Sequence, residues 1–239
     1  MAEQPRLFSF LLEDRSAAAL LVTESNAVAW ERLQRWPEWP SGVLALTGPQ
    51  GAGKTHMALA WAERARAGVC WPQDRGMDVF ERFNGRMVLD NADRYPDEPH
   101  LALLLDAARN TPGAAVLLVG RDRPDRWPVG LKDLRSRFAA MPLVTLGEPD
   151  DALLAGVLQR LCRARFIKLT EKAGTYLTAH MERSFATAQA VADALDRIHL
   201  RGARPVSIGL ASRALRSLGA DAPDPEPGVA AQDAEAEDA

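Results

Sequence analysis

The chain has 239 residues, 47% of them hydrophobic and 26% charged, enough to bury one large core or one core with a small appended domain. No apolar run approaches the ~18 residues of a membrane span, and the N-terminus lacks a basic-then-apolar signal layout. We therefore expect a cytoplasmic protein without a membrane partner. Neither the two cysteines, Cys70 and Cys162, nor the four histidines have metal-ligand spacing, which argues against a disulfide framework or a zinc site.

The formal charge of −3 hides a strongly acidic C-terminal segment. Residues 221–239 carry seven acids and no Lys or Arg, so the rest of the chain has a net charge of +4. The segment consists largely of Pro, Ala and acids, and we expect residues 220–239 to be disordered because they cannot bury enough apolar surface. The remaining positive charge is small and scattered. Direct sequence-specific DNA binding is therefore not expected.

Strand and helix patterns alternate through the first part of the chain. An alternation of this kind predicts a parallel sheet with helices on both faces. Short apolar runs predict strands at 43–47, 69–71, 86–90, 114–119 and 142–146, and helices are predicted at 55–67, 101–109 and 131–139.

Only helical patterns follow Pro149. Four segments suit helices, and Val191, Leu195 and Ile198 share one face of the third. We expect an α/β domain over 21–148 and a small all-α domain over 149–219. The four helical segments are 151–162, 171–180, 184–200 and 207–218.

The most specific motif is a glycine-rich segment directly after the first predicted strand. Its glycines let backbone N–H groups point at a di- or triphosphate, Lys54 supplies a positive charge to the outer phosphates, and Thr55 offers a hydroxyl to Mg²⁺. The motif predicts a site for ATP or ADP with Mg²⁺, which includes His56 beside the loop. The loop itself reads Gly48, Pro49, Gln50, Gly51, Ala52, Gly53, Lys54 and Thr55.

One carboxylate ends the third predicted strand and another follows shortly after it. Asp90 ends that strand at a distance typical of a second magnesium-associated group. The next residue is Asn91, where such ATPases normally have an acid that orients the attacking water, and an amide cannot accept the proton. Asp93 could substitute, although a solvated or capping role fits its loop position equally well. We expect Thr55 and Asp90 to hold Mg²⁺ and the chain's own ATPase activity to be weak or absent.

Three arginines near helix ends raise a second possibility. Arg135 and Arg137 lie at the end of the helix before the last strand, where an arginine can stabilise transition-state charge on a neighbour's γ-phosphate. The alternative is a surface helix with solvated arginines. Arg183 precedes a predicted helix and either contacts the nucleotide of its own chain or is solvated.

Residues 27–218 resemble the DnaA-related AAA+ proteins, and within them the Hda family of replication regulators, especially its alphaproteobacterial members. The matching stretches are AVAWERLQRWPEWPSGVLALTGPQGAGKTHMALAW, LRSRF and MERSFATAQAVADALDRIHLRGARPVS. The resemblance implies an AAA+ P-loop domain followed by a small all-α lid domain. It also implies that Lys54 and Thr55 belong to Walker A, Asp90 to Walker B, Arg137 is an arginine finger and Arg183 the sensor-2 arginine. A polar sensor-1 residue is implied after Val119, where Arg121 and Asp122 are both candidates.

Members of the Hda family also carry an N-terminal clamp-binding peptide, and the segment Gln4-Pro5-Arg6-Leu7-Phe8 resembles one. An extended peptide of this kind can place the Gln4 amide in a polar notch and the Leu7 and Phe8 side chains in an apolar pocket. Pro5 departs from the usual Leu, which loses an apolar contact but stiffens the extended form. The alternative is a terminus that packs on this protein's own core. The resemblance favours residues 1–20 as a clamp-binding peptide and linker.

The resemblance favours a regulator over an initiator, because DnaA continues into a helix-turn-helix domain where this chain has its acidic segment. The leading hypothesis is a nucleotide-bound protein, held on the DNA polymerase III beta sliding clamp, that offers Arg137 to DnaA-bound ATP. Its hydrolysis would then limit replication initiation. One alternative is a self-contained AAA+ ATPase acting as a helicase or clamp loader, and another is a nucleotide-stabilised adaptor without a catalytic contribution. A homo-oligomer is possible in each case.

Overall fold

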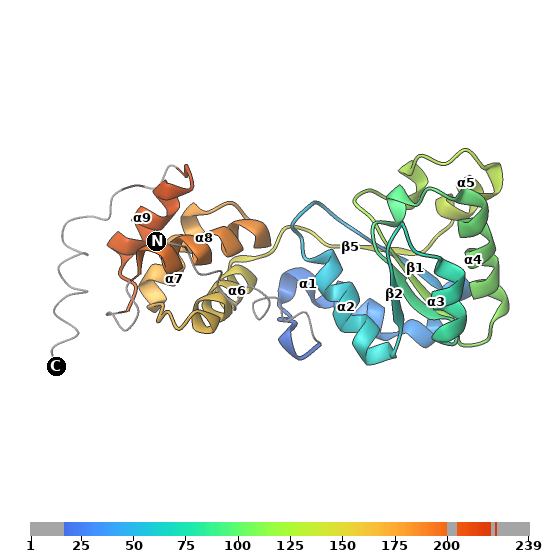
Figure 1. The fold of residues 1–239 in the computed structure, drawn as a ribbon, viewed down its shortest axis with the longest axis horizontal. Helices are drawn as coiled ribbons and strands as arrows, with labels where there is room; N and C mark the ends of the chain where they lie inside the picture. Colours follow the sequence, from blue (N-terminus) through green and yellow to red (C-terminus); the bar gives the residue numbers. More distant parts are fainter. Residues whose placement is uncertain (1–16, 200–204, 221–222, 224–239) are drawn as a thin grey trace, which may run out of the picture. The chain divides into compact units, whose positions relative to one another are not determined.

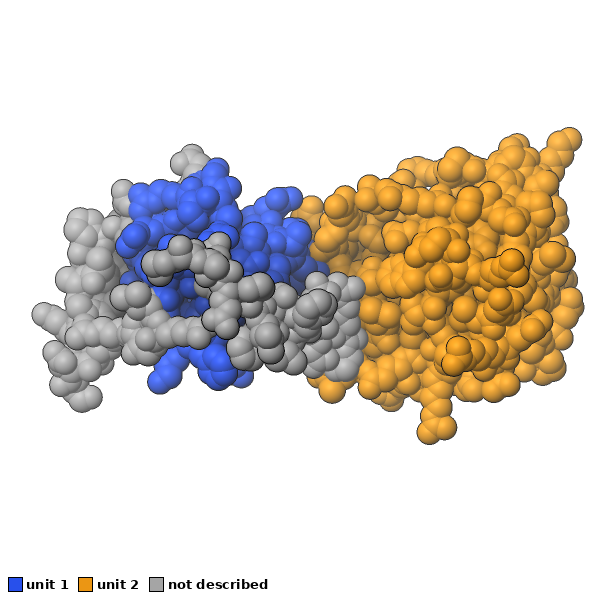
Figure 2. All heavy atoms as spheres, in the orientation of Figure 1, with its two compact units in different colours: residues 1–13, 149–239 blue, residues 14–148 orange. Residues whose placement is uncertain are grey.

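A computed structural model describes residues 17–199, 205–220 and 223. The chain divides into two compact units, with the boundary between Glu148 and Pro149 (Figure 2). Gln4, Leu7 and Phe8 of the expected clamp-binding peptide lie outside the described residues, as does most of the acidic segment. No helix in the described ranges is long and apolar enough to cross a membrane.

We call residues 14–148, orange in Figure 2, the first unit, and the residues from Pro149 onward, blue in Figure 2, the second unit. The first unit contains a parallel sheet (Figure 1), which confirms the predicted α/β fold. Its five strands have the order β2-β3-β4-β1-β5. Its strands are β1 (Val43–Thr47), β2 (Gly68–Cys70), β3 (Arg86–Leu89), β4 (Ala115–Val119) and β5 (Leu143–Thr145). Its helices are α1 (Glu24–Gln34), α2 (Lys54–Ala65), α3 (Gly76–Arg82), α4 (Glu98–Asn110) and α5 (Lys132–Ala139).

Helices cover both faces of this sheet because β4 is apolar throughout and β1 is apolar except for Thr47. In β1, Leu44 and Leu46 pack with α1 and α2, whereas Val43 packs with α3, α4 and α5 on the other face. All five residues of β1 are buried. A strand buried on both faces reads as an unbroken apolar run, which is why the sequence predicts β1 and β4 well.

Two helices of this unit, α1 and α3, were not predicted from the sequence. Helix α1 buries only a narrow stripe, Asn26, Ala29 and Leu33. Helix α3 has seven residues and buries Gly76 and Phe80. Such short or weakly apolar segments give little helical periodicity, so tertiary packing decides their structure.

The second unit is all-α and contains the four predicted helices. Each begins with a side chain that accepts a hydrogen bond from a backbone N–H of the first turn, the usual N-cap arrangement. Val191 and Leu195 are fully buried in its core, with Ile198 packed against them. The helices are α6 (Asp151–Ala164), α7 (Glu171–His180), α8 (Phe185–Ile198) and α9 (Ile208–Ser217), capped by Asp150, Thr170, Ser184 and Ser207.

Helix α6 ends in a left-handed turn that carries an unusual residue. Phe166 has φ 59°, and the N–H of Ile167 donates to the Cys162 carbonyl at 2.9 Å, the hydrogen bond of a Schellman cap. Glycine is the common residue at this position because a Cβ is strained there. Phe166 is 88% exposed, so little burial offsets that strain.

Replacing Phe166 with Gly should therefore stabilise the helical unit. The left-handed penalty for an L-residue exceeds the extra chain entropy of glycine, which leaves a gain of about 0.5 to 1 kcal/mol in the free energy of unfolding. Urea unfolding followed by far-UV circular dichroism measures it. Phe166→Ala is the control, because it removes the aromatic ring but keeps the strained Cβ. A lower stability of Phe166→Gly than of Phe166→Ala would contradict the strain argument.

Candidate functional site

The glycine-rich loop connects the end of β1 to the start of α2, and its backbone requires glycine. Gly48 has φ 147° and Gly53 has φ 86°. A Cβ at Gly48 would lie 2.3 Å from the Leu146 carbonyl oxygen, so no side chain fits there. The loop leads directly into Lys54, the first residue of α2. Backbone N–H groups at such a helix N-terminus are suited to bind an anion.

Lys54 lies over this loop. Its Nζ donates to the carbonyl oxygens of Gly48 and Pro49, both at 2.7 Å. An ammonium group has three donors, so one remains for a phosphate oxygen. Burial lowers the pKa of Lys54, an effect that the Asp90 carboxylate opposes.

Thr55 and Asp90 meet beside the loop. The Thr55 hydroxyl donates to Asp90 Oδ2 at 2.8 Å, and Asp90, directly after β3, is buried. The N–H of Asn91 donates to the other carboxylate oxygen at 2.9 Å. A hydroxyl and a carboxylate are oxygen ligands of the kind that Mg²⁺ prefers, so this pair fits the predicted metal.

Asn91 and Asp93 follow in the turn after β3. Asn91 is exposed, with φ 53°. The Asp93 Oδ2 atom accepts from the backbone N–H of Arg121 at 3.2 Å. Its Oδ1 atom is buried without a hydrogen-bond partner among the described residues. Asp93 therefore links the turn after β3 to the end of β4.

The end of β4 reaches the loop through Arg121. The Gly48 N–H donates to the Arg121 carbonyl at 3.1 Å, and the positive charge of Arg121 contributes to the lowered pKa of Lys54. The carbonyl of Asp122 instead accepts from Trp127 Nε1 at 2.8 Å. Of the two sensor-1 candidates, Arg121 is thus the one in contact with the loop. Sequence spacing did not distinguish them, because contacts between neighbouring strands are not local in sequence.

Arg137 lies elsewhere in the unit, at the opposite end of β1. It lines a pocket together with Val43, the first residue of β1, and with Pro142. The loop follows the last residue of that strand, and five strand residues span on the order of 15 Å. The structure therefore does not bring Arg137 to the loop of its own chain.

The Arg137 guanidinium is held by two carboxylates rather than solvated. Its Nη1 lies 2.6 Å from Asp106 Oδ1 and its Nη2 lies 2.7 Å from Asp133 Oδ2. The hydrogen bond to Asp106 is the main cause of a raised pKa of Arg137, and the same contact lowers the pKa of Asp106. Arg135 has a different partner, because its Nη2 donates to the Val129 carbonyl at 3.0 Å.

Arg183 and His56 are the remaining residues predicted for the nucleotide site. Arg183 belongs to the helical unit, where its Nη2 donates to Asp151 Oδ1 at 2.7 Å. His56 is partly buried in the first turn of α2.

Burial raises the pKa of Cys70 and of Cys162 to about 11, so both thiols are protonated at neutral pH. No group of three or more His, Cys, Asp or Glu within the described ranges could hold a metal ion.

No protein-family model matches this chain. Among solved structures, it is similar to domain III of the Thermotoga maritima replication initiation protein DnaA, with a TM-score of 0.68 and 14% identity over 86% of this chain and 97% of that one. A DNA replication initiation factor gives a TM-score of 0.62 and 15% identity over 77% of this chain, which spans 64% of its length. The Thermotoga maritima RuvB Holliday junction branch migration motor gives 0.61 and 17%, over 87% of this chain and 73% of that one. The chain therefore has the AAA+ fold, and at these identities the likeness shows the fold alone.

Proposed function

We propose that this chain is a DnaA-related AAA+ regulator of the Hda type. It binds ATP or ADP through the loop with Lys54, holds Mg²⁺ with Thr55 and Asp90, and attaches to the DNA polymerase sliding clamp. From there it presents Arg137 to ATP bound by DnaA and stimulates its hydrolysis, which restrains replication initiation. The proposal combines the sequence resemblance with the geometry of the first unit.

The observation that carries it is the place of Arg137. A guanidinium at the opposite end of β1 from its own loop has no route to its own nucleotide, so any phosphate that it contacts belongs to another molecule. Asn91 supports the same division of roles, because the residue directly after Asp90 is an amide where an acid would orient the attacking water. The chain thus offers a catalytic group to a partner while hydrolysing slowly itself.

Other residues have supporting roles in this proposal. Arg121, whose backbone contacts the loop, is the preferred sensor-1 residue. Arg183 remains the proposed sensor-2 arginine. The Hda resemblance and the structural likeness to DnaA domain III both favour a role in replication initiation.

Release of labelled phosphate from ATP preloaded on DnaA tests the function. The protein with ADP, DnaA and clamp loaded on DNA should release phosphate much faster than DnaA with clamp and DNA alone. Equal rates with and without the protein would contradict the proposal.

The likeness to the RuvB motor supports a second candidate, a self-contained AAA+ ATPase. The two functions predict different rates of ATP hydrolysis by this chain in the absence of DnaA. The proposed regulator should hydrolyse ATP slowly even with DNA present, because Asn91 cannot replace an acid. Rapid DNA-stimulated hydrolysis by the chain alone would favour the motor.

Clamp attachment makes a separate prediction about Gln4, Leu7 and Phe8. Replacing all three with Ala should remove clamp binding, measured by surface plasmon resonance, because the polar and apolar contacts are lost together. Nucleotide affinity should stay unchanged, since the loop of residues 48–55 is untouched. Phe10→Ala is the control, because that aromatic residue lies just outside the proposed peptide. Clamp affinity that survives the triple change would rule the peptide out.

A further inference from the structure

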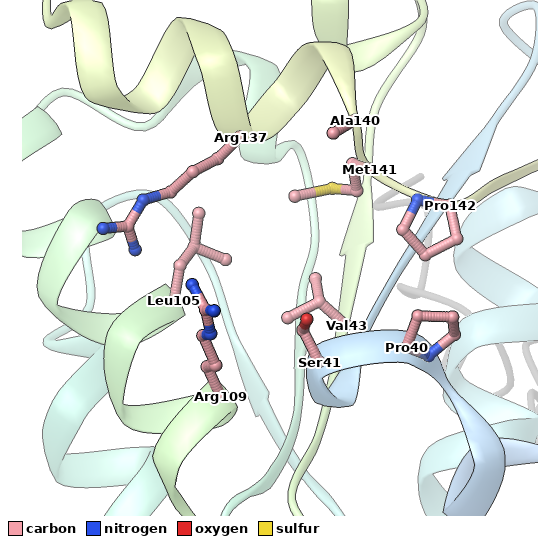
Figure 3. Close-up of a pocket in the computed structure, with 9 residues that line it drawn as sticks. All are labelled: Pro40, Ser41, Val43, Leu105, Arg109, Arg137, Ala140, Met141 and Pro142. Atoms are coloured by element: carbon pink, nitrogen blue, oxygen red, sulfur yellow. The ribbon is translucent and has the colours of Figure 1, made fainter.

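A pocket lies beside Arg137 at the amino end of β1 (Figure 3), and the proposed function gives it no role. It encloses about 220 Å³. Figure 3 shows side chains from α4 and α5 on one side of it and two prolines on the other. Its lining residues are Pro40, Ser41, Val43, Leu105, Arg109, Arg137, Ala140, Met141 and Pro142.

The pocket combines an apolar lining with positive charge. Val43 and Leu105 are buried, and Met141 is partly buried beside them. Arg109 is exposed, and its positive charge adds to the effect of Arg137 in lowering the pKa of the Asp106 carboxyl. Arg137 is less exposed and pairs closely with two carboxylates. Arg109 is therefore the cation of this pocket that is more accessible to an acidic residue of a partner.

The size of the pocket limits what it can hold. Pockets for small molecules and cofactors typically have volumes of about 300–1,000 Å³. A volume near 220 Å³ is smaller than that range and suits one large apolar side chain. Interface residues that bind most strongly are commonly single side chains of this kind, inserted into a pocket of the partner.

We propose that this pocket receives an apolar side chain of the ATP-bearing partner, with an acidic residue of the same partner paired to Arg109. The inference rests on the proposed function, because a partner that brings its nucleotide to Arg137 must cover the pocket that Arg137 lines. The two arginines then have separate roles. Arg137 acts on the phosphate, whereas Arg109 and the pocket hold the partner in place.

Filling the pocket tests this assignment. Ala140 is exposed and lines the pocket, so Ala140→Trp should occupy it without disturbing the core. Ala139→Trp is the matched control, because Ala139 is also exposed but does not line the pocket. Phosphate release from ATP on DnaA is measured against the concentration of each variant, with clamp and DNA present. Each variant should keep the ADP-induced thermal shift of the parent, which shows that it is folded.

Ala140→Trp should raise the half-maximal concentration by about tenfold or more, the equivalent of losing one buried anchor. The maximal rate of Ala140→Trp should stay close to that of the parent. For Ala139→Trp, both the half-maximal concentration and the maximal rate should match the parent. Arg109→Glu should also raise the half-maximal concentration, by about tenfold, because the new carboxylate would face the acidic residue of the partner and repel it. Its effect should weaken at high salt.

The outcomes separate this inference from the function on which it rests. If Arg137→Ala abolishes stimulation but Ala140→Trp and Arg109→Glu match the parent, the pocket assignment is wrong and the function stands. If Arg137→Ala has no effect, the function itself fails. If Ala140→Trp alters only self-association of this chain, a second copy occupies the pocket and the assignment to the ATP-bearing partner is overturned.

Discussion

Arg137→Ala is expected to reduce the stimulated hydrolysis of ATP on DnaA by about 10³-fold or more. An arginine finger has an effect of this size because it contacts charge that develops only in the transition state. The variant should fold normally. Asp106 and Asp133, its two partners, are 46% and 62% exposed, and exposed ion pairs of this kind contribute little to stability.

Arg135→Ala provides the matched control for this measurement. It lies two residues away in the same helix and removes the same charge, but its guanidinium contacts the Val129 carbonyl instead of Asp106. It should stimulate DnaA like the parent, and both variants should keep ADP binding and clamp binding. If Arg137→Ala stimulates as well as the parent, the trans-acting finger is wrong and the non-catalytic adaptor becomes the better explanation.

Lys54→Ala should eliminate the thermal stabilisation that ADP gives to the parent. A ligand present at 100 times its Kd stabilises the folded state by about 2.7 kcal/mol through mass action, and loss of binding removes that gain. The replacement removes the ammonium that contacts the Gly48 and Pro49 carbonyls, and with it the positive charge offered to phosphate. Each melting temperature is measured with and without ADP and Mg²⁺, so the variant is its own reference.

Lys132→Ala serves as the control for lost charge, because Lys132 is exposed and lies outside the loop. Its ADP-induced shift should equal that of the parent. An undiminished shift in Lys54→Ala would show that ADP binds somewhere other than the glycine-rich loop.

The sheet was predictable because its central strands can be recognised from their own short stretches of sequence. Each is an apolar run bounded by turn residues, and β1 and β4 were placed within one residue of their observed ends. The edge strands were also placed within one residue of their ends. The second strand was expected at 69–71 and runs from Gly68 to Cys70, a shift of one residue, since its ends depend on pairing with β3 rather than on its own composition.

In the candidate site too, only residues that are close together in the sequence could be predicted. Lys54 and Thr55 lie within one contiguous motif, so spacing alone located them. The partners of Arg137 could not be found in this way, because Asp106 belongs to another helix, 31 positions earlier in the chain. The contact of Arg121 with the loop likewise depends on β4 lying next to β1. Contacts of this kind arise only when the topology is known.

The separation of the loop and Arg137 at opposite ends of β1 gives the first unit a polarity. A contact that joins the Arg137 end of one molecule to the nucleotide end of the next uses two different surfaces, so it is heterologous. Molecules joined in this way all point in the same direction, without a twofold axis between them. If the proposed function holds, a molecule that offers its Arg137 end to a partner therefore acts on that one neighbour, while its own loop lies on a different surface and stays accessible to another molecule.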